Sequence, residues 1–231
     1  MILKSVRNTL AAAALAFATL PCLAAEPIYF NQPESAALFA SAELKDDYWS
    51  LAHYFVSERY LTYCGIASSV MTLNSLGVKS PVAPLLYPYQ IFTEENIFTE
   101  DALKIKPVST IEREGLTLPE LSQLLALYAS EVQHTFAADS SVEEFRQVAL
   151  ATLQDPNKRL IINYLRTAVE QVGGGHISPI AAYDEASDRF LMLDVARYKY
   201  PPSWITASDM FNSMLPHDSD GESRGYVVVS K

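Results

Sequence analysis

The chain has 231 residues, of which 49% are hydrophobic and 19% are charged, and it contains only 8 glycines. This composition is typical of a folded protein with a sizeable core, and it excludes disorder, collagen-like repeats and small disulfide-stapled scaffolds. The formal charge of −10 makes nucleic acid and anionic membrane surfaces unfavourable partners, whereas a cation or a small neutral substrate is easier to accommodate.

Residues 1–25 have the pattern of a cleavable secretory signal. Lys4 and Arg7 precede an apolar stretch, residues 10–20, that is much shorter than the ~20 residues of a membrane-spanning helix. Pro21 ends this stretch, and mostly small residues follow it. We therefore expect export, in a bacterium to the periplasm, without stable membrane insertion after cleavage.

Cleavage after residue 25 would change both the charge and the cysteine content. Two basic residues would leave, which takes the formal charge from −10 to −12, and Cys22 would leave with them. Residues 26–231 contain no linker and no internal repeat, so we predict a single domain. Cys64 would be its only thiol. A lone cysteine in an oxidising compartment is either buried and inert or kept for chemistry.

Helices are predicted in the N-terminal half. Residues 33–43 have helical spacing, and residues 46–49 read as a polar corner. Apolar residues at helical intervals predict a helix over residues 64–76. Capping boxes at 117–120 and 141–144 predict two more helices.

Strands are predicted in the C-terminal half. Four β-rich segments are separated by turn residues: 159–166, 176–183, 189–198 and 225–230. Residues 184–188 would close a hairpin between the middle two. Helices followed by hairpin-connected strands predict an α+β fold with a largely antiparallel sheet.

Cys64 and His176 are the first candidates for chemistry. Cys64 begins a predicted helix, where the dipole and free backbone N–H groups stabilise a thiolate and could hold an oxyanion. His176 follows three glycines, which weaken a strand unless a close approach requires them. Its imidazole could take the thiol proton and return it to a leaving amine, and the alternative is a hydrogen-bonded structural histidine.

Asp194 completes the candidate set. It is an acid among apolar residues in a predicted buried strand, so it needs a partner. A hairpin at 184–188 would make its strand adjacent to that of His176, and the two residues have the same parity. A carboxylate there would orient the imidazole. The order Cys, His, Asp suggests a papain-like cysteine enzyme.

Three segments resemble the signature blocks of the phytochelatin synthase family. They are YCGIASSVMTLNSLG (63–77), GGGHISPIAAYD (173–184) and FLMLDVARYKYPPSW (190–204), and residues 46–49 and 223–231 extend the similarity. In length the chain resembles short bacterial members, which lack the Cys-rich C-terminal domain of the plant enzymes. The resemblance implies a papain-like fold with the nucleophile at a helix N-terminus.

The resemblance also implies a reaction, with Cys64, His176 and Asp194 as a catalytic triad. Glutathione would be attacked at its Cys–Gly amide, glycine would leave, and γ-glutamylcysteine would remain on Cys64 as a thioester. Water would then give γ-glutamylcysteine, and a second glutathione would give phytochelatin, in heavy-metal detoxification or glutathione turnover. Without the Cys-rich domain, we expect hydrolysis to exceed transpeptidation.

The sequence gives little support for a metal held by the protein. Its four histidines are scattered, and no Cys/His pair has zinc-ligand spacing. Under the resemblance, cadmium or zinc ions would enter as thiolate complexes of glutathione.

Three further residues are assigned through the resemblance. Arg166 and Arg224 match basic positions around the family's γ-glutamyl site, and arginine binds carboxylates bidentately. The alternative for each is a salt bridge. Glu58 stands where the family usually has a glutamine that donates to the oxyanion, and an ionised carboxylate cannot donate. Either Glu58 is protonated in a dry site, or another donor such as the Cys64 N–H suffices, or turnover is slow.

Two other functions are compatible with the same residues. One is a papain-like peptidase that acts on glutathione S-conjugates. The other is a non-catalytic periplasmic protein that binds a thiol or a metal–thiolate complex. A homodimer is the candidate assembly. An exported α+β protein with an inert buried cysteine would require all three sequence blocks to coincide by chance.

Overall fold

A computed structural model describes residues 25–231. The predicted secretory signal, apart from its last residue, lies outside this range. Within the range, no helix combines the length and the apolar character that crossing a membrane requires.

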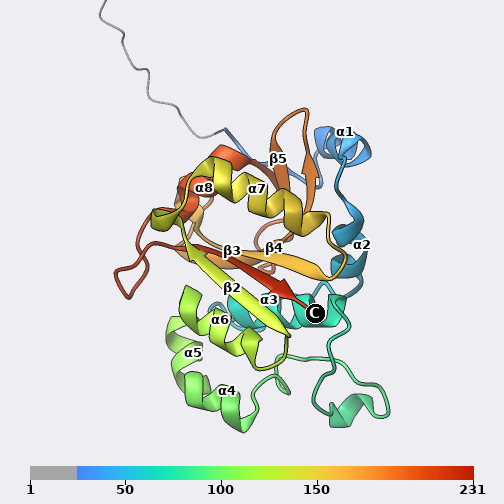
Figure 1. Ribbon diagram of the computed structural model, residues 1–231, viewed down its shortest axis with the longest axis vertical. Coiled ribbons are helices and arrows are strands. Elements are labelled where there is room, and N and C mark those ends of the chain that lie inside the picture. The colour runs from blue at the N-terminus through green and yellow to red at the C-terminus, as the bar shows by residue number, and fades with distance from the viewer. Residues whose placement is uncertain (1–24) are drawn as a thin grey trace, which may run out of the picture.

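The described chain forms a seven-stranded antiparallel sheet between two groups of helices (Figure 1). The strands are β1 (Ile28–Tyr29), β2 (Glu131–Phe136), β3 (Lys158–Leu165), β4 (Gly175–Asp184), β5 (Arg189–Met192), β6 (Ser203–Thr206) and β7 (Gly225–Ser230). They lie in the order β1-β6-β5-β4-β3-β7-β2. The α-helices are α1 (Pro33–Ser41), α2 (Asp46–His53), α3 (Cys64–Ser75), α4 (Glu100–Ile105), α5 (Val108–Glu114), α6 (Leu118–Ala126), α7 (Val142–Leu153) and α8 (Ala207–Met214). Short 3₁₀ turns are η1 (Pro84–Leu86), η2 (Ala137–Asp139) and η3 (Arg166–Val169).

The two faces of the sheet carry separate cores, because successive side chains of a strand point to opposite faces. On β3, Leu160 and Ile162 belong to the core under α7 and α8, whereas Ile161 belongs to the core that contains α3 and α6. Figure 1 shows these helix pairs on opposite sides of the sheet. The result is a three-layer arrangement with β3 and β4 near its centre.

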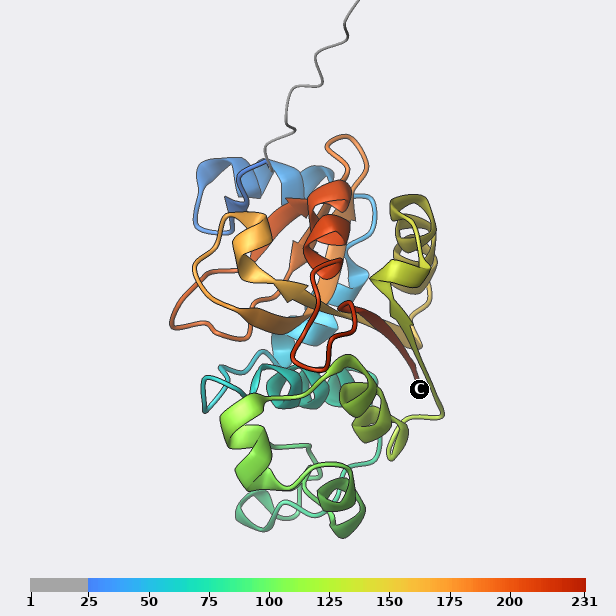
Figure 2. The same cartoon turned by 90° about the vertical axis from the view of Figure 1, so that its left-hand side faces the viewer.

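Helix α3 is buried along almost its whole length. It lies between the sheet and the helices α4, α5 and α6, which form the lower end of the molecule in Figure 2. The Ser68 hydroxyl donates to the carbonyl of Ile177 on β4 at 3.0 Å. This bond fixes α3 against the strand that carries His176, so the helix start and the strand start are held next to each other.

The α+β class, both capping boxes and the hairpin are confirmed. Helix α6 begins after Thr117 and helix α7 after Ser141, each with the reciprocal side-chain bonds of a capping box. Strands β4 and β5 pair across residues 184–188. The resulting sheet is antiparallel throughout the described residues.

Two predicted elements are wrong in detail. Residues 46–49 are not a corner but the first turn of α2, whose Asp46 and Asp47 lie at the N-terminal end, where acidic residues are favourable. The strand predicted over 189–198 ends at Met192. Beyond it, the Asp194 carboxylate accepts the N–H of Ala196 at 2.9 Å, a local turn that replaces strand pairing.

Candidate active site

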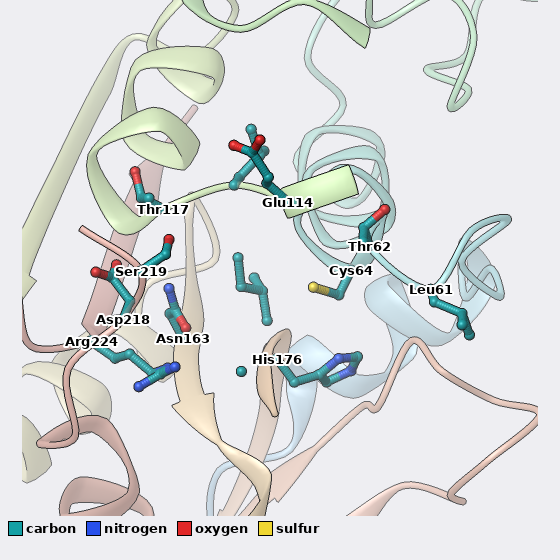
Figure 3. Close-up of a pocket in the computed structure, with 14 residues that line it drawn as sticks. Leu61, Thr62, Cys64, Glu114, Thr117, Asn163, His176, Asp218, Ser219 and Arg224 are labelled. Atoms are coloured by element: carbon teal, nitrogen blue, oxygen red, sulfur yellow. The ribbon is translucent and has the colours of Figure 1, made fainter. Parts of the chain in front are cut away.

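Cys64 is the first residue of α3 and opens onto a pocket of about 220 Å³. The side chain is 8% exposed. Backbone N–H groups in the first turn of a helix have no partner inside the helix, and they give that end a partial positive charge. In Figure 3 the Cys64 sulfur points into the pocket, with Asp218 and Arg224 on the facing wall. The thiol therefore lies at the positive end of α3 and has an open side for a substrate.

His176 and Asp194 are in direct contact, although Asp194 lies just beyond the end of β5 and not on the strand predicted for it. His176 Nε2 lies 2.8 Å from Asp194 Oδ1, and both residues are buried. The bond leaves Nδ1 as the ring nitrogen available to a further partner. A ring nitrogen of His176, the Cys64 sulfur and a carboxylate oxygen of Glu58 all lie within 4.8 Å of one another.

The protonation of His176 reflects these neighbours. Burial has the largest single effect and lowers its pKa, but the negative charge of the Cys64 thiolate, the Asp194 carboxylate and hydrogen bonds to both outweigh it. Together they raise the pKa of His176 to about 9. Burial acts to raise the pKa of Asp194, yet His176 and Arg166 hold it at about 2. At neutral pH His176 is thus an imidazolium beside the Asp194 carboxylate.

Arg166 binds the carboxylate of Asp194, whereas the resemblance implied that it binds a carboxylate of the substrate. Its terminal nitrogens donate to both oxygens of Asp194, at 2.7 and 3.0 Å, and the residue is 3% exposed. It also stacks near the ring of Tyr200. Because both ends of its fork are used, the structure makes Arg166 a positioning group for Asp194 rather than a free anion receptor.

Arg224 faces the pocket onto which Cys64 opens. It lies on the wall of the Cys64 pocket, and its Nη1 donates to the carbonyls of Pro216 and His217 at 2.7 Å. Among the described residues no carboxylate forms an ion pair with it, and its Nε has no partner. The guanidinium packs flat against Gly175, where a Cβ would come within 3.1 Å of Nη2. A charge held this way is available to an incoming carboxylate.

Glu58 lies beside the thiol and the imidazole. Its Oε1 accepts the hydroxyl of Tyr198 at 2.6 Å, while its buried Oε2 has no partner. The residue is 5% exposed. Its N–H donates to the carbonyl of Val195, next to Asp194, which anchors position 58 to the same loop. Glu58 therefore lies next to the nucleophile, as its position in the sequence suggested. Because Tyr198 donates to Oε1, the oxygen without a partner is Oε2.

A second pocket adjoins the first on the other side of His176. It measures about 170 Å³, and its wall includes Glu58, Tyr198 and Lys199. His176, Leu61 and Gly175 line both pockets. The imidazole therefore borders both pockets, and the thiol borders the first.

Several residues of the cleft were not singled out from the sequence. Tyr198 donates to Glu58, Asp218 lines the first pocket and Lys199 lines the second, each from outside the helices and strands. Their only sequence signal is nearness to the block around Asp194 or to Arg224. Loop residues of this kind have no periodicity that would mark them.

The chain is similar to proteins of one described family. A model of the family described as phytochelatin synthase matches residues 19–226. Glutathione gamma-glutamylcysteinyltransferase 3 of Lotus japonicus is 29% identical over 208 residues, which cover 88% of this chain and 42% of the relative. The Schizosaccharomyces pombe glutathione gamma-glutamylcysteinyltransferase is 32% identical over 187 residues, 80% of this chain and 43% of the relative. The chain thus spans about two fifths of the length of these curated relatives.

Proposed function

The chain belongs to the phytochelatin synthase family, and we propose that it is a cysteine-dependent glutathione γ-glutamylcysteinyltransferase with a papain-like fold. The observation that carries the proposal is the cluster of a buried thiol at a helix N-terminus, an imidazole and a carboxylate, next to an unpaired arginine. Cys64 is the proposed nucleophile, His176 the proton carrier and Asp194 the group that orients the imidazole.

The proposed first half-reaction starts from a Cys64 thiolate beside a protonated His176. The Cys64 thiolate attacks the carbonyl carbon of the Cys–Gly amide, and the C=O electrons move onto oxygen. Backbone N–H groups at the start of α3 are positioned to donate to this oxyanion. When the C–N bond breaks, its electron pair leaves with the glycine nitrogen, which takes the proton from His176. A thioester of γ-glutamylcysteine remains on Cys64.

The second half-reaction uses the neutral His176 that the first one leaves. It takes a proton from water or from the amine of a second glutathione as that nucleophile attacks the thioester carbon. The C–S bond breaks and the Cys64 thiolate is restored beside the imidazolium. Water gives γ-glutamylcysteine, and the amine gives phytochelatin, with the same residues serving both products.

The charges of the cleft match the two ends of glutathione. In the first pocket, Arg224 suits the α-carboxylate of the γ-glutamyl group, and Asp218 on the same wall suits its ammonium. In the second pocket, Lys199 suits the carboxylate of the glycine that leaves. With the scissile amide between them, the substrate would lie across Cys64.

Mass spectrometry tests this proposal directly. The purified protein and its Cys64→Ser variant are mixed briefly with glutathione, in the presence of a chelator, and then denatured. We expect a γ-glutamylcysteinyl adduct and released glycine only where Cys64 is present. Neither adduct nor glycine with the unsubstituted protein would contradict the proposal. Turnover of glutathione S-conjugates alone would move the assignment to a conjugate peptidase, and binding without turnover would move it to a thiol-binding protein.

Export is part of the proposal, because residues 1–25 have the charge and apolar pattern of a secretory signal. The intact mass from the same spectra tests it. Protein recovered from the periplasm of a bacterial host should lack residues 1–25, and a full-length mass there would contradict cleavage.

A further inference from the structure

Within residues 25–231, one group of three side chains has the composition and spacing of a metal site. A carboxylate oxygen of Glu58, the sulfur of Cys64 and a ring nitrogen of His176 all lie within 4.8 Å of one another, and all three residues are buried. Glu58 and Cys64 are close in the sequence but His176 is distant, so ligand spacing along the chain could not reveal the group.

We propose that Glu58, Cys64 and His176 form a site for a thiophilic divalent cation of the Zn²⁺ type, and that the bound ion blocks the thiol as a nucleophile. In a tetrahedral zinc site with metal–ligand bonds of 2.0–2.3 Å, ligand atoms lie about 3.5 Å apart. The three atoms, which lie within 4.8 Å of one another, would therefore need to close in by no more than about 1.3 Å. A thiolate and a carboxylate together balance the charge of the ion.

The free oxygen of Glu58 is the strongest indication of a ligand. Glu58 is 5% exposed, and its Oε2 is buried without a hydrogen-bond partner. A buried polar atom in this state is costly unless something binds it. Its other oxygen is held by the hydroxyl of Tyr198 at 2.6 Å, and a carboxylate oxygen of Glu58 lies within 4.8 Å of both the thiol sulfur and an imidazole nitrogen.

His176 is prepared for a metal in the same way. Its Nε2 is bonded to the Asp194 carboxylate at 2.8 Å, which leaves Nδ1 free. Zinc-bound histidines commonly donate their other ring N–H to a carboxylate, which orients the ring and strengthens it as a ligand. Two of the three proposed ligands thus already have the outer partners that a metal site requires.

The chemistry of the ligands selects the ion. Thiolate favours Zn²⁺ and related soft cations and disfavours Mg²⁺ and Ca²⁺, which prefer oxygen ligands alone. Three protein ligands leave a fourth position for water, facing the cleft lined by Glu58 and His176. Binding forms an S–metal and an N–metal bond, and the one proton held by the Cys64–His176 pair is released to solvent.

Cobalt titration tests the site without any substrate. Co²⁺ is added to the purified protein in a thiol-free reductant, and the thiolate-to-cobalt charge-transfer band is recorded, with Zn²⁺ then added as a competitor. We expect one ion per chain, no such band in Cys64→Ser, and at least about tenfold weaker binding in Glu58→Gln. Glu143→Gln, an exposed glutamate on α7, is the matched control and should bind as the unsubstituted protein does.

Two further measurements guard against a folding artefact. Tyr198→Phe leaves all three ligands in place but frees the Glu58 carboxylate, and it should weaken binding by a smaller factor than Glu58→Gln. Zn²⁺ should also protect Cys64 from iodoacetamide in the unsubstituted protein, with protection shifted to higher Zn²⁺ in Glu58→Gln.

The site is refuted if saturating Co²⁺ gives no charge-transfer band, or if Glu58→Gln binds as tightly as the control. Neither result depends on glutathione. The adduct experiment is done with a chelator present, so the metal site and the proposed reaction can fail separately.

Discussion

At the scale of single residues, the Glu58 side chain sets how much the oxyanion can be stabilised. Tyr198 donates to Oε1, so an amide at position 58 would keep its oxygen toward Tyr198 and turn its NH₂ toward the site. That group would donate where Oε2 now cannot. It would also remove a carboxylate from the neighbourhood of a developing negative charge.

We therefore predict that Glu58→Gln raises kcat with glutathione by about tenfold, less than the ~100-fold that a fully adapted oxyanion donor contributes. Steady-state rates of glycine release, measured with a chelator so that metal release is not the cause, check this. Adding Tyr198→Phe should remove most of the gain, because the amide would lose its orientation. An unchanged or lower rate in Glu58→Gln would exclude position 58 from oxyanion stabilisation.

Arg166 shows the limit of assigning a role from residue type. An arginine ten residues before His176 suits a substrate carboxylate, but Asp194 offers the same chemistry inside the protein and is 0% exposed. A buried carboxylate that is already bonded to an imidazole still needs partners for its second oxygen. The sequence shows a positive charge at position 166, but it could not decide whether this charge binds a carboxylate of the substrate or that of Asp194.

At the scale of elements, the glycines in and near the site differ in why a side chain is excluded from their positions. Gly225 begins β7, and a Cβ there would collide with the backbone carbonyl of Thr135 on the neighbouring strand β2. Gly173 has a φ of 134°, which side chains rarely adopt. A Cβ added at Gly174 would meet no other atom within 4 Å. Of the three consecutive glycines, one is needed for its backbone and another, Gly175, for the close approach of a side chain.

The contrast predicts unequal effects of alanine. Gly225→Ala should lower the free energy of unfolding by about 2 kcal/mol, because the backbone of β2 must move to admit the methyl group. Gly174→Ala should change it by less than about 0.5 kcal/mol. Urea denaturation of the two variants checks this. Equal losses would mean that the pairing of β7 with β2 adapts at no cost.

Elements with strong local signals were predictable, and those without them were not. The capping residues of α6 and α7 and the apolar spacing of α3 are local patterns, and the structure has these helices. Strand β2 was missed because its sequence, EVQHTF, is largely polar and lies at the sheet edge, held by its pairing with β7. Pairing with a distant strand leaves no mark in a local pattern.

At the scale of the whole molecule, the site depends on long-range placement. Cys64, His176 and Asp194 come from a helix start, a strand start and a loop, and each was suggested by its own sequence block. Their proximity was supported by the hairpin between β4 and β5, but the packing of α3 on β4 is a tertiary contact that sequence spacing cannot give. Only the tertiary structure shows that Lys199 and Tyr198 line the second pocket and that one oxygen of Glu58 has no partner.

A second long-range contact ties α2 to the sheet. Nη1 of Arg159 on β3 lies 3.0 Å from Oδ1 of Asp47 on α2, and both residues are almost fully buried. Arg159 also donates to the hydroxyls of Ser50 and Ser75, so it joins α2, the end of α3 and β3. The Oδ2 atom of Asp47 has no partner. Burial raises the pKa of Asp47 to about 7, although Arg159 acts to lower it.

This shift fixes the sign of a pH effect on stability. An unfolded Asp titrates near pH 3.8, so between about pH 4 and pH 7 the folded chain holds a proton at Asp47 that the unfolded chain has lost. The stabilising contribution is complete below pH 4 and disappears as the pH rises through 7. We predict that the unfolding free energy of the unsubstituted protein, relative to Asp47→Asn, falls over this window by up to about 4 kcal/mol.

Urea denaturation at half-unit intervals from pH 4 to pH 8 measures this difference. Asp46→Asn, one position earlier and exposed, is the control, and its difference from the unsubstituted protein should stay nearly constant above pH 5. If the Asp47→Asn difference also stayed constant across the window, Asp47 would be ionised throughout. Its pairing with Arg159 would then outweigh burial, and the contact between α2 and the sheet would be a full ion pair.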